Sequence, residues 1–186
     1  LNENDFNLVA DSANKILSFN DRIVDAYFML SEVRYKQNKK ELSENILLKG
    51  YSKIIGNVQD EIKIVSLLGR NYIESNQLDK LMSKINEIID RHPNDNQALS
   101  MLAVAHILNK DKSSAETILR KLTNEDKNDV KNRFLLVNLL AGTALENKQL
   151  TPLLNEILAI NPLHQKSRII RVIQHIKLKK FKSAKK

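Results

Sequence analysis

The sequence lacks most of the residues on which disulfide-linked, thiol-dependent and membrane-spanning proteins rely. It has no cysteine and no tryptophan, and only four glycines and three prolines among 186 residues. Without cysteine, neither a disulfide framework nor a thiolate site can form. No run of about 18 apolar residues occurs, which excludes a transmembrane helix. Hydrophobic residues make up 42% of the chain but aromatic residues only 5%, so we expect an all-α fold of short helices packed through aliphatic side chains.

Residue patterns typical of enzymes and metal sites are also missing. No two of the four histidines have the His-x-x-x-His spacing that puts two ligands on one helical face: His92, His106, His164 and His175. The four glycines are isolated from one another, so the chain has no glycine-rich phosphate loop. The carboxylates of Asp60-Glu61 and of Glu125-Asp126 are adjacent in sequence and point apart on a helix. We therefore predict no catalytic residue, no metal site, no cofactor and no enzymatic activity.

The net charge of +8 is concentrated at the C-terminus. From Ile157 to Lys186 there are nine lysines and arginines and no acidic residue, which leaves residues 1–156 with a net charge of −1. Seven of these cations form a candidate basic patch: Lys166, Arg168, Arg171, Lys177, Lys179, Lys180 and Lys182. Such a patch can bind nucleic acid or an anionic surface. It can equally be a solvated helix end, since Phe181 is the only aromatic residue among these cations.

A repeat of about 34 residues runs through the chain and predicts a helical solenoid. If Pro93 and Pro162 each close a repeat, helix pairs start at Val24, Ile62, Asn96, Lys131 and Gln165, at spacings of 38, 34, 35 and 34 residues. We place the excess of four residues, about one helical turn, in the second helix near residues 42–56. The expected first helices are 23–36, 58–75, 95–109, 129–146 and 163–179, and the expected second helices are 40–55, 78–91, 112–122 and 150–160.

Polar, turn-prone residues occur at each predicted join within a pair, and they suit tight loops between antiparallel helices. These joins are Gln37-Asn38, Asn76-Gln77, Asn109-Lys110-Asp111 and Asn147-Lys148. Both ends of the chain cut a repeat: residues 5–20 resemble a second helix alone, and Lys180 to Ala184 resemble the opening of another. The repeats are therefore expected to cover 1–23, 24–61, 62–95, 96–130, 131–164 and 165–186, as a single array that is a fragment of a longer one.

The repeats resemble those of tetratricopeptide-repeat (TPR) proteins. In that family the first helix carries a large residue at position 4, Leu at 7, a small residue at 8 and Tyr at 11, and the second carries Ala at 20. The repeat at Ile62 matches with Leu68, Gly69 and Tyr72, although Leu81 replaces the usual Ala. The resemblance implies a right-handed α-solenoid of antiparallel helix pairs, a TPR-like superhelix.

The resemblance also implies a concave groove lined by first-helix positions 2, 5, 9 and 12. The candidate partner-binding residues at these positions are Phe28, Tyr35, Arg70, Val104, Ile107, Leu135, Leu139, Ile169 and Ile173. The apolar members have two interpretations, which the sequence leaves open. They are either a hydrophobic trough for a partner's helix or extended segment, or core side chains, because the frame is shifted by one residue or because tight curvature buries them against neighbouring helices.

These expectations define three hypotheses about function. The favoured one is a non-catalytic scaffold that binds a segment of a partner protein in its groove, as part of a larger bacterial assembly in the cytoplasm or periplasm. The first alternative is binding of nucleic acid or an anionic surface through the basic patch, which predicts strong salt dependence. The second alternative is a spacer for an enzyme or anchor in the flanking sequence. The sequence identifies neither the partner nor the oligomeric state.

Overall fold

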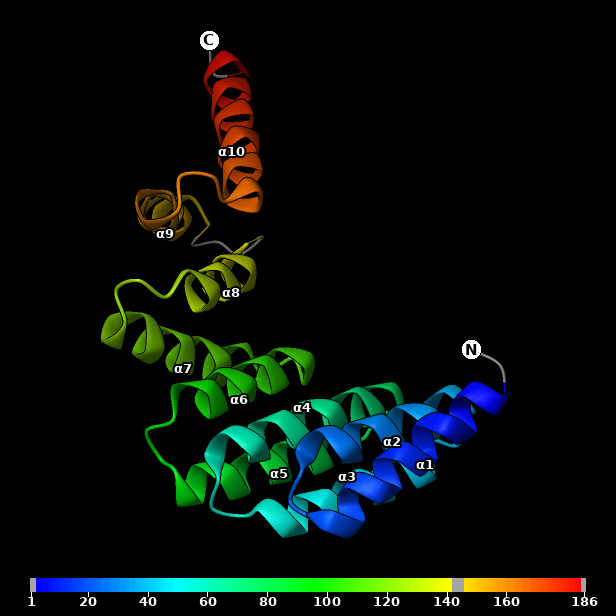
Figure 1. Cartoon of the computed structure of the whole chain (residues 1–186). Helices are drawn as coiled ribbons and strands as arrows, with labels where there is room; N and C mark the ends of the chain where they lie inside the picture. Colours follow the sequence, from blue (N-terminus) through cyan, green and yellow to red (C-terminus); the bar gives the residue numbers. More distant parts are fainter. Residues whose placement is uncertain (1–2, 142–145, 185–186) are drawn as a thin grey trace. The chain divides into compact units, whose positions relative to one another are not determined.

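A computed structural model describes residues 3–141 and 146–184 of the chain. Within these residues the structure has ten helices and no strand (Figure 1). Contacts divide the chain into two compact units, an N-terminal unit of residues 1–105 and a C-terminal unit of residues 106–186. The all-α prediction is confirmed, and each unit is built of helix pairs.

The N-terminal unit contains α1 (Glu3–Phe19), α2 (Val24–Lys36), α3 (Lys40–Ile54), α4 (Val58–Glu74), α5 (Leu78–Arg91) and most of α6 (Asn96–Leu108). Consecutive helices from α1 to α5 pack on one another, and α2 also contacts α4 (Figure 1). The first helices α2 and α4 are therefore neighbours, as the repeat predicted.

The turn within each of three pairs has the same local structure. Asn38, Asn76 and Lys110 adopt the left-handed conformation, with φ of 59°, 54° and 62°. In each turn the next residue donates its N–H to a carbonyl five residues earlier, as in Lys39 to Arg34 at 2.9 Å. This hydrogen bond is typical of a Schellman C-cap, and asparagine tolerates its left-handed residue well. The first three predicted joins are confirmed.

The core of the N-terminal unit follows the predicted repeat positions. Val65, Leu68, Gly69 and Tyr72 are all buried on the inner face of α4, and burial raises the pKa of Tyr72 to about 12. A Cβ built on Gly69 would lie 3.5 Å from Cδ1 of Leu81. Position 8 of this repeat therefore packs against position 20, with room for a methyl group between the two helices.

The extra helical turn lies at the start of α4, and our prediction that it lies in α3 was wrong. Gly56 has a φ of 97° just after the end of α3, and the side chain of Asn57 caps α4 by accepting from Asp60 N–H. The added turn carries Glu61, which is fully buried. Its carboxylate accepts from Gly56 N–H at 2.5 Å and from Arg91 at 2.6 Å. This burial fixes the α3–α4 turn against the end of α5.

The C-terminal unit contains α7 (Lys112–Glu125), α8 (Val130–Leu140), α9 (Glu146–Ile160) and α10 (Gln165–Ala184), packed in chain order. Two predicted boundaries are wrong. The helix predicted over 129–146 ends at Leu140, and Asn147 and Lys148 lie inside α9 rather than in a join. Gly142-Thr143, a weak helix-forming pair, follows the end of α8. Helix α10 continues through Lys180, because no turn-forming residue interrupts its lysine-rich end.

The burial pattern of α8 fits a repeat that starts at Val130. Arg133, Leu136, Val137 and Leu140 are buried, with the spacing of positions 4, 7, 8 and 11, whereas Asn138 is exposed. In the predicted frame, Asn138 would occupy the small, buried position. Starting one residue earlier restores a 34-residue spacing from Asn96 and removes this conflict.

Candidate partner-binding surface

The first-helix positions predicted to line a groove lie side by side on α2 and α4. Asp25 of α2 forms an ion pair with Lys63 of α4, and Glu32 forms one with Arg70. Both pairs join residues that are 38 positions apart, the spacing of these two repeats. Positions 2 and 9 of one repeat thus contact positions 2 and 9 of the next, which aligns the two helices in one continuous face.

Arg70 and Tyr35, two of the predicted groove residues, are in direct contact. The Arg70 guanidinium lies 3.6 Å from the centre of the Tyr35 ring, a cation–π geometry. The Tyr35 hydroxyl donates to Glu74, whose other carboxylate oxygen accepts from Lys40 at 2.7 Å. These contacts link Arg70, Tyr35, Glu74 and Lys40 in one network on the polar half of the face.

This network predicts an acid-sensitive contribution to stability. Hydrogen bonds from Lys40 and then Tyr35 lower the pKa of Glu74. A carboxylate with a lowered pKa stabilises the fold above its ordinary titration range, and that stability is lost as the pH falls through the lowered pKa. We expect Glu74→Gln to be less stable than the natural protein at neutral pH, with the difference shrinking in acid. Urea unfolding at a series of pH values measures this; a difference independent of pH contradicts it.

Two apolar side chains interrupt the polar face of the N-terminal unit. Phe28 on α2 is 37% exposed and Ile73 on α4 is 45% exposed. Each stands at a predicted groove position, next to the charged pairs. The face therefore combines fixed charges with apolar area that a partner could cover.

The six remaining groove candidates lie in different environments. Val104, Ile107 and Leu135 are half-buried, while Ile169 and Ile173 on α10 are 59% and 47% exposed. Leu139 is only 7% exposed. Its burial favours a role in the core over a role in a hydrophobic trough. The one-residue shift in α8 explains this, because it places Leu135 and Leu139 beside the groove positions and puts Phe134 and Asn138 at them.

An apolar pocket at the starts of α8 and α10 was missed from the sequence. It has a volume of about 620 Å³ and is lined by Val130, Lys131, Phe134, Leu135, Asn161, Leu163, His164, Gln165 and Lys166. Phe134 forms an edge contact with His164, their ring centres 4.9 Å apart. The correct frame at Val130 would have indicated Lys131 and Phe134, since they then fall at positions 2 and 5.

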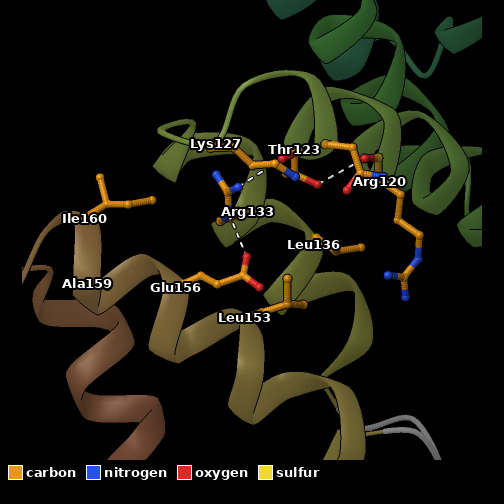
Figure 2. A pocket seen from close by; sticks show the side chains of 10 residues that line it. Arg120, Thr123, Lys127, Arg133, Leu136, Leu153, Glu156, Ala159 and Ile160 are labelled. Atoms are coloured by element: carbon orange, nitrogen blue, oxygen red, sulfur yellow. Dashed lines mark hydrogen bonds and ion pairs between the residues drawn. The ribbon is translucent and has the colours of Figure 1, made fainter.

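A second pocket, of about 420 Å³, lies among α7, α8 and α9 (Figure 2). Figure 2 shows the Arg133 side chain directed at Glu156, and their Nε–Oε2 distance is 2.9 Å. The guanidinium also donates to the carbonyl oxygens of Thr123, Asp126 and Asp129 at 3.0–3.2 Å. These contacts engage all three guanidinium nitrogens of Arg133. The side chain that borders this pocket therefore joins the end of α7 and the α7–α8 turn to α9.

The predicted basic patch is described only in part. Lys166 and Arg168 are exposed and Arg171 is half-buried, whereas the side chains of Lys177, Lys179, Lys180 and Lys182 lie outside the described residues. In the residues searched, no group of three or more histidine and acidic side chains could hold a metal ion. None of the described helices has the length and apolar character that crossing a membrane requires.

No protein-family model matches the sequence, and no curated protein is significantly similar to it. Solved structures do match. YrrB, described as a TPR protein with an unusual peptide-binding site, is 12% identical with a TM-score of 0.61, over 90% of this chain and 84% of YrrB. MamA is 11% identical with a TM-score of 0.63, over 88% of this chain and 93% of MamA. PilF of Pseudomonas aeruginosa is 13% identical with a TM-score of 0.64, over 92% of this chain and 78% of PilF.

These similarities establish the fold. The chain is a TPR-like repeat protein, an all-α structure of stacked helix pairs. The family resemblance inferred from Leu68, Gly69 and Tyr72 is thereby confirmed at the level of fold.

Proposed function

We propose that this protein is a non-catalytic scaffold that binds a segment of a partner protein across its first-helix face, within a larger bacterial assembly. One observation carries the proposal: equivalent positions of α2 and α4 contact each other and form a continuous face with exposed apolar side chains. Repeated first helices of this kind provide extended binding surfaces in repeat proteins. YrrB, which shares the fold, is itself described as having a peptide-binding site.

The face of the N-terminal unit is suited to an extended or helical segment. Its charged groups are already paired with one another. The face therefore carries both signs of charge and has no strong net attraction for a positively or a negatively charged partner. Phe28 and Ile73 provide apolar area on the two neighbouring helices. A partner that covers them gains hydrophobic burial, which depends little on salt.

The proposal predicts that a Phe28→Lys/Ile73→Lys variant loses its partner. Co-precipitation from a bacterial lysate with the natural protein, at low and at high salt, should retain a protein that the variant fails to retain. Both substituted residues are at least one-third exposed, so far-ultraviolet circular dichroism should show unchanged helicity. Leu8→Lys is a matched control, since Leu8 is 69% exposed on α1 and lies outside the predicted face.

Three other outcomes would contradict the proposal. Nucleic acid retained by both proteins at low salt and released at high salt would place function in the basic residues of α10, such as Lys166 and Arg168. A protein retained equally by the variant and by the natural chain would place its binding elsewhere than on this face. Absence of any retained molecule would favour a role as a spacer.

A further inference from the structure

The apolar pocket at the starts of α8 and α10 has a fixed floor. The imidazole of His164 caps α10: Nδ1 lies 2.8 Å from Ser167 Oγ and accepts from Ser167 N–H at 3.3 Å. Ser167 is fully buried, so this contact anchors the ring. Phe134 then packs edge-on against the imidazole at an interplanar angle of 65°. The floor of the pocket is therefore formed before a ligand arrives.

The rim of the pocket is positively charged. Lys131 and Lys166 line it, and none of the other lining residues is acidic. Lys166 Nζ lies 5.9 Å from the centre of the Phe134 ring, which places its charge beside the apolar floor. The nearby carboxylate of Asp129 is engaged in capping α8, where it accepts from the backbone and side chain of Asn132 at 2.9 and 2.6 Å.

Among the described residues, Lys131 and Lys166 lack the acidic partner that the equivalent lysine of the N-terminal unit has. There, Lys63 at position 2 of α4 is paired with Asp25 of the neighbouring repeat. Lys131 stands at the same repeat position in α8, yet within the described part of the chain neither Lys131 nor Lys166 has an acidic partner within ion-pair distance. Two cations at the edge of an apolar pocket, both without a carboxylate, complement a ligand that brings its own.

We propose that this pocket binds an acidic segment of another protein, by taking up one large apolar side chain while Lys131 and Lys166 bind the carboxylates that flank it. The inference rests on the proposed scaffold function and adds the chemistry of the partner. Leu163, which lines the pocket and is 76% exposed, offers apolar area that the inserted side chain would cover. A segment with a phenylalanine, tryptophan or leucine between aspartates or glutamates fits both features.

A random 12-residue peptide display library, selected against the full chain, tests the proposal directly. The enriched peptides should combine a large apolar residue with neighbouring acidic residues. Fluorescence polarisation with the corresponding synthetic peptides should show Kd values raised about tenfold or more by Lys166→Glu and by Phe134→Ala. Lys112→Glu is the matched control, because it makes the same charge change at an exposed residue that does not line the pocket; its Kd should be unchanged.

A charge exchange separates recognition from a structural effect. A peptide with lysine in place of its acidic residues should bind the Lys131→Glu/Lys166→Glu variant better than it binds the natural protein, which a merely unfolded pocket cannot produce. Enriched peptides without acidic residues, or an unchanged Kd in the Lys166→Glu and Phe134→Ala variants, overturn the inference. If those peptides instead lose binding to the Phe28→Lys/Ile73→Lys variant, the scaffold function stands and this pocket is not its site. A selection without enriched peptides also overturns the inference.

Discussion

Replacing Gly50 by alanine is expected to destabilise the N-terminal unit by about 2 kcal/mol. A Cβ at this position would lie 2.6 Å from Cγ of Tyr27 and 3.1 Å from Cδ1 of Ile64. Tyr27 cannot swing away, because it is only 1% exposed and its hydroxyl donates to the Asp21 carbonyl at 2.9 Å. Overpacking of this kind typically costs about 1–3 kcal/mol, and the better helix propensity of alanine recovers at most about 1 kcal/mol.

Gly69→Ala is the matched comparison and should have the opposite sign. Gly69 is also buried inside a helix, but its added methyl group would meet Leu81 at an ordinary contact distance of 3.5 Å. The gain in helix propensity then dominates, and we expect a stabilisation of up to about 1 kcal/mol. Thermal and urea unfolding of the two variants provide the test. Equal destabilisation by both substitutions would show that tight packing around Gly50 is not the cause.

A double-mutant cycle localises the effect of Gly50. Tyr27→Leu removes the ring that the new methyl group would strike, so Gly50→Ala should cost less in that background than in the natural one. Additive free energies of unfolding would instead mean that the ring and the methyl group do not meet.

Replacing Arg133 by methionine is expected to destabilise the C-terminal unit by about 3 kcal/mol. Arg133 is 3% exposed, and its guanidinium joins the end of α7 to Glu156 of α9 (Figure 2). Methionine keeps the apolar contacts of the side chain but leaves the buried Thr123 carbonyl without its donor. Charge-assisted hydrogen bonds contribute about 1.5–3 kcal/mol each, and Glu156 is exposed enough to regain hydration.

Hydrogen exchange measured by mass spectrometry shows where the Arg133 effect acts. Peptides from α7, α8 and α9 should exchange faster in Arg133→Met, while peptides from α2 to α4 should be nearly unchanged, since each repeat packs mainly on its neighbours. Arg120→Met is the control: Arg120 lines the same pocket and donates to Glu116 and Gln149, but its side chain is 41% exposed, so its ion pair should contribute less than about 1 kcal/mol. A similar loss of stability in both variants would refute a special role for Arg133.

Much of the fold could be predicted because it is encoded locally. Helices α2 to α7 begin and end within about three residues of the predicted bounds, since their ends carry turn-forming residues such as Asn38 and Asn76. The first-helix alignment was also predictable: the 38-residue spacing brought Asp25 to Lys63 and Glu32 to Arg70. Prediction failed at α8, because counting back from Pro162 set the repeat to start at Lys131 instead of Val130, and this shift by one residue hid Phe134.

The sequence by itself determined that this protein is a stack of helix pairs, because helical periodicity and capping depend on residues within one or two turns of each other. Only the tertiary structure decided which polar and small residues are buried where helices pack together. Glu61 and Arg133 are charged residues of types usually found on the surface, and nothing in the sequence around Gly50 distinguishes it from the other glycines. All three are nevertheless buried. Their roles depend on partners that lie more than 20 residues away in the sequence, Arg91, Glu156 and Tyr27. Contacts at such separations leave no local periodic signal, so they become visible only when the helices are packed together.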